Sequence, residues 1–362
     1  MTEVLLKELS NQDIDWMLAN GIRTEIEPGT VLIQQGQPLE ALHILLDGAL
    51  TVSLSQPDAN PLGRAFAALE GGTLPGREIA QLSSGEMVGE IPFVESYLPS
   101  TTVCATTKSV VLTISMKHLI QKLQQDLSFA AHLYRASAVL LANRLEQMID
   151  QLGHSTVVLS QPVLREALII FAQLHDSDIE WLIAAGRVQQ IAADTVLIRS
   201  GRPIEALHIL LDGAIALNAA EEGNLLTQAF SHLENNQPQT REFARLSRGD
   251  IVGETTFIEA QQSAIAVKAL RDSRVLSIPR WRLAAKLLHD VGFAARFYRV
   301  LAILLADKQQ AIVSRLGYGR VGYSSGQALE NSYANELDPD FLSEVGLAGA
   351  RFEWMLKRIG ID

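Results

Sequence analysis

The stretch Glu40–Ala49, EALHILLDGA, returns letter for letter at Glu205–Ala214. An identical run of ten residues, offset by 165 positions, indicates that the chain arose by duplication. Within it, Leu42–Leu46 has the two-residue alternation of a β-strand. The pair Asp47-Gly48 is typical of a type I′ turn, which needs positive φ at both central positions. We therefore predict that each copy centres on a β-hairpin.

The sequence on both sides of this stretch repeats in the same order. A helix capped at Ser10 and ended at Gly21 is expected first, because Ser10 is followed three residues later by an acidic side chain. Many short apolar runs separated by turn residues follow, which is typical of a β-sandwich, roll or barrel. Each copy then ends in a long apolar helix, predicted at 129–152 and 293–316.

The repeat defines the predicted domain organisation. We expect one domain over 1–153, a linker over 154–162 and a second domain over 163–317. The remaining residues, 318–362, begin with a Gly/Ser-rich segment and end in a tail with helix signals. Each domain also carries one long excursion of polar and mixed composition, at 55–76 and 219–240. Loops of this length are commonly functional.

The tail is too apolar for a solvated chain end. Asp338 can cap a helix that has Pro339 at its first position. The apolar residues of the tail are Phe341, Leu342, Phe352, Trp354, Met355 and Leu356. We therefore predict a terminal helix docked on a roll of its own chain or on a neighbouring subunit.

Composition excludes several classes of function. The formal net charge of −11 opposes non-specific binding to nucleic acid, and no apolar run reaches transmembrane length. The N-terminus has neither a basic region nor a long apolar region, so we expect no signal peptide and a cytoplasmic location. Cys104 is the only cysteine, which rules out an intrachain disulfide and favours a small core residue.

Motifs of catalysis and metal binding are not supported. The run 322–326 matches G-x-S-x-G, but no strand precedes it and no histidine follows it, so the hydrolase interpretation is rejected. The eight histidines show no metal-ligand spacing. His43 and His208 occupy matching positions and are interpreted as residues of a sheet face rather than ligands. We expect no enzymatic activity.

The arrangement resembles the cyclic nucleotide-binding domain, the β-roll (double-stranded jelly-roll) module of the catabolite activator protein and of the protein kinase A regulatory subunit. The resemblance implies a mainly β fold with helices, present twice. It depends on residues that recur at family positions: Val31-Leu32-Ile33, Gly36, Gly48, Gly89-Glu90 and Phe93 in the first copy, and Gly201, Gly213, Gly253-Glu254 and Phe257 in the second.

The resemblance also implies where a ligand would bind. In the family the Gly-Glu pair opens a phosphate-binding cassette, and its glutamate accepts a hydrogen bond from the ribose 2′-hydroxyl. An arginine about nine residues later pairs with the phosphate, but here that position holds Pro99 and Ser263. The candidate ligand-binding residues are Gly89, Glu90, Pro99, Ser100 and Thr101, then Gly253, Glu254, Ser263 and Ala264.

One basic position near the cassette is shared by both copies. Arg77-Glu78 recurs as Arg241-Glu242 just before a predicted strand. These arginines are surrogate candidates for the missing phosphate partner, but a solvated charge pair at the end of a strand is the favoured interpretation. We expect weak or absent affinity for cyclic AMP, because neither Pro99 nor Ser263 carries charge.

Two classes of function remain. One is a ligand sensor, in which a cyclic nucleotide or another small nucleotide binds one or both rolls and moves the helices that follow. The other is a docking scaffold with no nucleotide, which binds a protein partner through its loops and tail. The missing arginines favour docking, and the retained Gly-Glu pairs favour sensing. An enzyme is a distant third.

The output domain of the catabolite activator protein has no counterpart in this sequence. Only 45 residues follow the second copy, and they contain no basic recognition helix. Tandem rolls of this kind resemble a cyanobacterial family associated with bacteriocin-type transport, which implies an accessory role in peptide or protein export. In relatives, the long helix after the roll pairs with its counterpart in a dimer. We therefore predict that the helices at 129–152 and 293–316 pack against each other within one chain.

Overall fold

The computed structural model describes residues 2–54, 77–89, 99, 101–152, 166–220, 240–254, 265–315 and 339–361. The chain divides into two compact units, 1–144 with 305–334 and 145–304 with 335–362. The division falls inside the two long helices, so each of these helices contributes to both units. The predicted linker at 154–162 lies outside the described residues, as does most of both long excursions.

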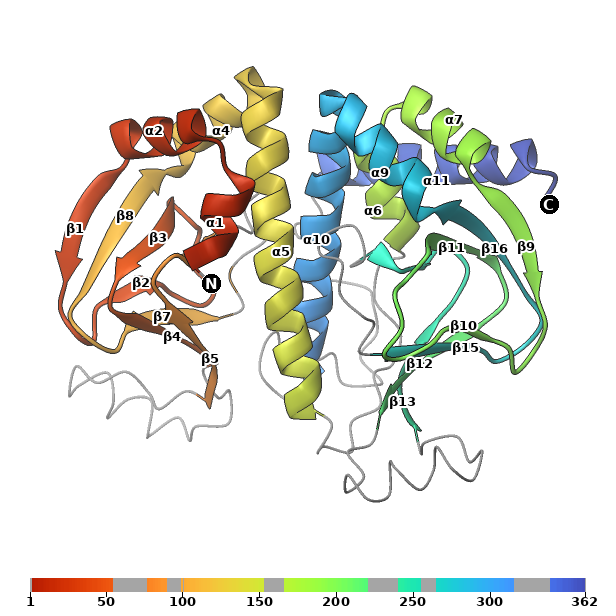
Figure 1. Cartoon of the computed structure of the whole chain (residues 1–362), viewed down its shortest axis with the longest axis horizontal. Helices are drawn as coiled ribbons and strands as arrows, with labels where there is room; N and C mark the ends of the chain where they lie inside the picture. The colour runs from red at the N-terminus through yellow and green to blue at the C-terminus, as the bar shows by residue number, and fades with distance from the viewer. Residues whose placement is uncertain are drawn as a thin grey trace. The chain divides into compact units, whose positions relative to one another are not determined.

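The first roll consists of two four-stranded antiparallel sheets, with strand orders β1-β8-β3-β6 and β2-β7-β4-β5 (Figure 1). Its strands are β1 (Ile22–Ile26), β2 (Val31–Ile33), β3 (Ala41–Asp47), β4 (Ala49–Leu54), β5 (Arg77–Ser83), β6 (Met87–Val88), β7 (Thr102–Ala105) and β8 (Ser109–Ser115). Its helices are α1 (Thr2–Glu8), α2 (Asn11–Asn20), α4 (Met116–Gln125) and α5 (Leu127–Leu152).

The second roll repeats this topology, with strand orders β9-β16-β11-β14 and β10-β15-β12-β13. Its strands are β9 (Arg187–Ile191), β10 (Val196–Ile198), β11 (Ala206–Asp212), β12 (Ile215–Ala220), β13 (Thr240–Leu246), β14 (Ile251–Val252), β15 (Ile265–Ala269) and β16 (Ser273–Pro279). Its helices are α6 (Glu166–Gln173), α7 (Asp176–Ala185), α9 (Arg280–His289) and α10 (Val291–Arg315), and α11 (Pro339–Arg358) follows. The predicted fold class is thus confirmed.

The prediction of a β-hairpin at Asp47-Gly48 is wrong. Strand β3 pairs with β6 and β8, whereas β4 pairs with β5 and β7, so the turn carries the chain from one sheet to the other. Gly48 has a φ of +101°, but Asp47 keeps a negative φ, which a type I′ turn does not allow. A Cβ at Gly48 would lie 2.2 Å from Ser109 Oγ. Glycine is therefore required by close packing against β8 as well as by its φ.

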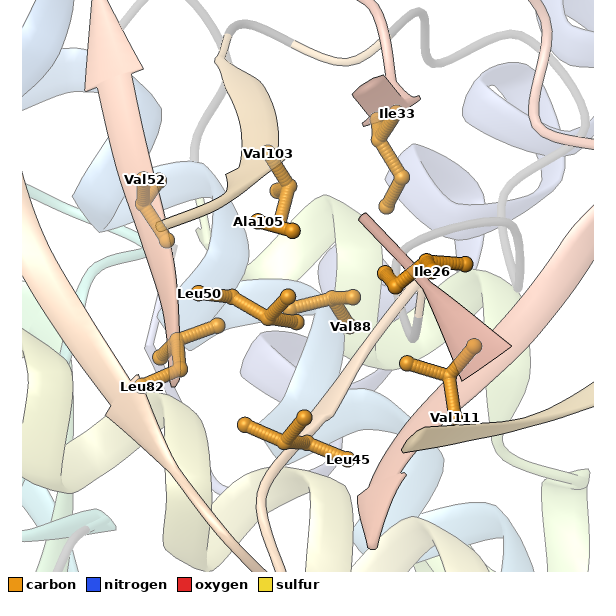
Figure 2. Packing of buried hydrophobic residues seen from close by; sticks show 10 residues of the cluster. All are labelled: Ile26, Ile33, Leu45, Leu50, Val52, Leu82, Val88, Val103, Ala105 and Val111. Carbon is orange, nitrogen blue, oxygen red and sulfur yellow. The ribbon is translucent and has the colours of Figure 1, made fainter. Parts of the chain in front are cut away.

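The core of each roll is the apolar space between its two sheets. Figure 2 shows the first core, in which side chains from both sheets point toward one another. It consists of Ile26, Ile33, Leu45, Leu50, Val52, Leu82, Val88, Val103, Ala105 and Val111. The matching core of the second roll consists of Ile198, Ile204, Leu210, Ile215, Leu217, Leu246, Val252, Val267 and Val275. Burial of each large aliphatic side chain contributes about 1.5–3 kcal/mol.

The middle part of each long helix is buried around its whole circumference. Ala138–Leu141 in α5 and Val300–Ile303 in α10 are runs of four buried residues, and four successive positions cover every side of a helix. Within the first unit, Gln309 Nε2 of α10 donates a hydrogen bond to the Leu141 carbonyl of α5, at 2.5 Å. The predicted contact between the two helices is supported at this point.

The terminal helix α11 docks on its own chain, as predicted. Its main contacts are with α6 and α7 of the second unit. Phe352, Met355 and Leu356 are buried, and the Phe352 ring lies 5.5 Å from the Phe171 ring of α6. Trp354 departs from the prediction because much of it is exposed. Phe341 and Leu342 have side chains outside the described residues.

Among the helices of the described residues, none combines the length and the apolar character needed to cross a membrane.

Candidate ligand-binding site

The Gly-Glu pair of each roll follows a very short strand. Strand β6 pairs with β3 through only two residues, Met87 and Val88, and Gly89 comes next with a φ of +93°. A Cβ at Gly89 would lie 2.6 Å from the Ala41 carbonyl oxygen of β3. Gly253 has a φ of +88° and the same 2.6 Å clash with the Ala206 carbonyl oxygen. The glycine of each pair is therefore explained by backbone packing alone.

The structure describes the glutamate of the Gly-Glu pair in the second roll but not in the first. Glu90 lies outside the described residues. Glu254 directly follows Gly253 and is buried. A buried carboxylate needs polar partners, because its desolvation is costly. The role that the family resemblance assigns to Glu254, that of accepting a hydrogen bond from a ligand hydroxyl, stays a prediction.

Pro99, which the resemblance places at the position of the phosphate arginine, has a structural role in the first roll. Pro99 is buried, and its carbonyl accepts a hydrogen bond of 2.8 Å from the Gly36 amide, which follows β2. Nearby, the Gln35 amide donates to Thr102 Oγ1 at 3.2 Å. The segment around Pro99 thus fixes the turn after β2 and brings no positive charge. Thr101 is half-buried beside it.

The other predicted cassette residues, Ser100, Ser263 and Ala264, lie outside the described residues. The surrogate arginines are placed by their backbone only. Arg77 begins β5 opposite Leu54, and Arg241 lies opposite Ala219 near the start of β13. Their side chains lie outside the described part of the chain.

The favoured interpretation of Arg241 is a charge pair with Glu242. The structure adds a second basic residue near Glu242 to that interpretation. Glu242 forms its ion pair with Arg245, three residues along β13. Hydrogen bonding and attraction from the Glu242 carboxylate raise the pKa of Arg245 above its ordinary value. Glu242 is therefore engaged by Arg245.

Both copies of the repeated histidine lie on the inner face of their roll. His43 is opposite Val88 in β6 and Thr113 in β8, and its Nδ1 lies 3.0 Å from Thr113 Oγ1. Since Val88 belongs to the core, its cross-strand partner His43 faces the interior as well. Burial lowers the pKa of His43 below its ordinary value. The interpretation of this histidine as a sheet-face residue is confirmed.

The second roll extends this contact into a chain of three polar groups. His208 Nδ1 lies 2.8 Å from Ser277 Oγ, and Ser277 Oγ donates to Gln189 Oε1 at 2.9 Å. Because the Ser277 proton goes to Gln189, Ser277 must accept from an Nδ1–H, which leaves Nε2 of a neutral ring as an acceptor. Burial lowers the pKa of His208 to about 4, in agreement with a neutral ring.

Sequence reasoning missed one contact near the first cassette. Arg144 of α5 donates from Nη2 to the Met87 carbonyl at 2.6 Å. Met87 begins the strand that leads to Gly89, so the long helix is bonded to the entrance of the Gly-Glu turn. The only signal in the sequence is a basic residue at the end of the apolar run 138–142, and nothing in that pattern identifies its partner.

The arrangement offers buried hydrogen-bonding groups inside a β-roll. Over the described ranges there is no cluster of three or more His, Cys, Asp or Glu residues suited to a metal ion. The polar groups on the inner faces, such as His208 and Ser277, are neutral. Such groups are suited to binding through hydrogen bonds.

Comparison with known proteins identifies the repeated module. The family model described as "Cyclic nucleotide-binding domain" matches residues 23–126 and 188–290. No curated protein matches the chain.

The chain is also similar to solved structures at low sequence identity. A mutant regulatory subunit of a cAMP-independent protein kinase A from Trypanosoma brucei, bound to cAMP in the A site, is 16% identical, with 86% of this chain and 93% of that chain covered and a TM-score of 0.32. The regulatory domain of Toxoplasma gondii PKA with cAMP is 16% identical, covers 80% and 89%, and has a TM-score of 0.28. The N-terminal domain of a transcriptional regulator from Streptomyces coelicolor is 19% identical, covers 41% and 91%, and has a TM-score of 0.30.

Proposed function

Because the chain belongs to the cyclic nucleotide-binding domain family, with one domain in each half, we propose that it is a non-enzymatic regulatory protein whose rolls sense a small ligand other than cyclic AMP. The observation that argues against cyclic AMP as the ligand is Pro99. It occupies the position of the phosphate arginine, has no charge, and is held by the Gly36 amide. Ser263 leaves the second roll without that charge as well.

The missing charge sets the expected affinity. A hydrogen bond to a charged group contributes about 1.5–3 kcal/mol, so its loss weakens binding by roughly tenfold or more. A ligand that offers hydroxyl or amine donors suits the polar character of the buried Glu254 and the neutral His208. These groups favour a sensor for an uncharged or weakly charged nucleoside-like ligand.

Calorimetric titration with cyclic AMP and cyclic GMP at physiological salt tests this proposal. We expect dissociation constants above the micromolar range for the wild type. Ser263→Arg should tighten cyclic AMP binding, and Ser263→Lys is a matched control for charge without the two-pronged geometry of a guanidinium. A sub-micromolar constant for the wild type would contradict the proposal. In that case Arg77→Ala and Arg241→Ala would test the surrogate arginines.

A docking scaffold with no nucleotide is the second candidate. It is favoured by Gly89 and Gly253, since backbone packing explains both glycines without a ligand. The described part of the tail is docked on α6 and α7, so the excursions at 55–76 and 219–240 remain the candidate partner sites of this alternative. Failure of Glu254→Ala to alter the binding of any nucleoside would favour the scaffold.

The closer likeness to the bacteriocin-type transport family supports an accessory role in peptide export, carried out in the cytoplasm. This role is tested by measuring the amount of exported peptide in a strain that lacks this gene. Unchanged export would contradict this role and leave the ligand proposal untouched.

A further inference from the structure

One exposed helix face differs sharply between the two halves. In α9, Trp281 and Leu288 are 68% and 77% exposed, and they lie seven residues apart on the same side of the helix. Ala284 and Ala285, also exposed, lie between them. The α9 face, defined as these four residues, is therefore apolar and open to solvent. Exposed tryptophan beside exposed leucine is typical of interaction sites.

The matching face of the first half is polar except for Ile120. The offset of 164 places Lys117, Ile120, Gln121 and Gln124 of α4 at the same positions. The rest of the two helices agrees closely, because Leu119 and Leu283 are both buried and each helix ends with a Lys–Asp ion pair. Since the fold is satisfied by either kind of face, the apolar residues of α9 are not needed to hold the roll together.

Arg282 lies at the α9 face, and two further arginines lie close to it along the backbone. Arg282 lies over the Trp281 ring, 5.2 Å from its centroid, and donates to the Ala185 carbonyl at the end of α7 at 3.1 Å. Arg187 follows Ala185 by two residues, and Arg280 directly precedes Trp281. Among the described residues, none of the three has a carboxylate partner. The first half has Ile22, Met116 and His118 at these positions.

We propose that the α9 face docks an acidic amphipathic helix of a partner protein. The apolar stripe accepts the apolar side of that helix, and Arg187, Arg280 and Arg282 face its carboxylates. The proposal does not depend on a nucleotide. It places the partner on a helix of the second half, not on the loops or tail.

A second copy and a bilayer are both less suited to the α9 face. Two copies that met face to face would bring six arginines together without carboxylates between them. An anionic bilayer is disfavoured because two large apolar side chains, Trp281 and Leu288, give little insertion. An acidic helix meets neither obstacle, because its carboxylates neutralise the three arginines near the α9 face.

The test uses the full chain and a labelled synthetic helix of 18 residues with leucine on one side and glutamate on the other. Fluorescence anisotropy should show binding that weakens as salt is raised. Trp281→Lys and Leu288→Gln, which install the residues of the first half, should each weaken binding at least tenfold. Arg187→Gln and Arg280→Gln should weaken it and reduce its salt dependence. Ile120→Gln on α4 is the matched control and should change nothing.

Three outcomes would overturn the proposal. The first is the absence of binding to the wild type, or equal binding by the Trp281→Lys and Leu288→Gln variants. The second is a dimer, seen by sedimentation, that either variant dissociates, which would assign the face to a second copy. The third is sedimentation with phosphatidylglycerol vesicles that both variants abolish while the peptide stays unbound. Melting curves of the variants should match the wild type, because Trp281 and Leu288 are exposed.

Discussion

The two copies of EALHILLDGA have the same sequence and the same strand and turn, but their surroundings differ. Leu46 is 37% exposed, whereas its counterpart Leu211 is fully buried. His43 is half-buried, and His208 is buried and linked through Ser277 to Gln189. The two identical stretches therefore adopt the same backbone conformation, but the burial of their side chains is decided by segments far away in the sequence.

The helix before each roll shows the same effect more strongly. Leu6 of α1 is 65% exposed, whereas Phe171, at the matching position of α6, is fully buried against Phe352 of α11. Arg351 of α11 also donates to the carbonyls of Phe171 and Leu174, at 2.9 and 3.0 Å. These carbonyls belong to the end of α6, where helix acceptors lack intrahelical partners. The tail therefore completes the second half in a way that has no counterpart at Leu6.

A third difference concerns a buried carboxylate. Asp13 and Asp178 occupy matching positions at the start of α2 and α7, and both accept a hydrogen bond from the amide three residues earlier. In the first half the partner on α5 is His132, with Nδ1 at 2.8 Å. In the second half Arg296 of α10 makes two hydrogen bonds to Asp178, at 2.7 and 3.0 Å. An imidazole can lose its charge near neutral pH, whereas a guanidinium cannot.

The largest effect on stability is expected from removal of the tail helix α11, which packs on the second half. Deletion of 327–362 removes the buried Phe352, Met355, Leu356 and Ile361 and exposes Phe171. At about 1.5–3 kcal/mol for each large side chain, the loss exceeds 5 kcal/mol. We expect calorimetry to show a transition of the second half shifted to much lower temperature, while the transition of the first half is retained.

The milder variant Arg351→Ala should give the same pattern with a smaller shift, and Lys357→Ala on the exposed side of α11 is its control. An unchanged melting temperature after truncation, with the same mass per subunit in light scattering, would contradict the docking of α11.

The second prediction concerns the partners of Asp13 and Asp178. Arg296→Ala leaves a carboxylate that is only 3% exposed without its cation, which should cost about 3–5 kcal/mol in the free energy of unfolding. His132→Ala should cost only about 1 kcal/mol, because His132 is partly exposed and Asp13 keeps its bonds to Ser10. Urea unfolding of both variants measures the difference.

Acid pH sharpens this test. Burial would raise the pKa of Asp13, but hydrogen bonds from Ser10 and His132 outweigh burial and lower it below the ordinary value. The stabilisation is therefore present at neutral pH and is lost as pH falls through the lowered pKa of the folded state. His132→Arg should bring the first half closer to the second. Equal costs for Arg296→Ala and His132→Ala would show that the two sites are equivalent after all.

The sequence predicted the elements of this fold better than their pairing. Alternation in 42–46 identified β3, and the capping pair Ser10 and Asp13 identified the start of α2. The Asp47-Gly48 signal predicted the wrong partner strand, because a turn motif specifies local dihedral angles and not the sheet that receives the next strand. The positive φ at Gly48 was predicted correctly, and its close approach to Ser109 was not.

The candidate site was predicted only where one segment defines it. Gly89 and Gly253 follow from the resemblance and are explained by contacts with β3 and β11. The bonds from Arg144 to Met87 and from His208 to Ser277 span 57 and 69 residues. Such pairs are decided by tertiary packing, and no spacing rule within a single copy identifies them.

The smallest effect is expected from the repeated histidine, and it separates two residues of identical local sequence. Burial lowers the pKa of His208 from 6.5 to about 4, so between these values the unfolded chain binds a proton that the folded chain does not. Stability must therefore fall as pH falls through this window, by roughly 2 kcal/mol between pH 7 and pH 4.5. His208→Gln should remove that loss, whereas His43→Gln should remove less, because His43 is less buried. Urea unfolding at both pH values measures the effect, with NMR titration of the two rings as the direct reading. If both variants lose as much stability as the wild type, burial of His208 does not control the protonation of the second roll, and the copies are alike at this position.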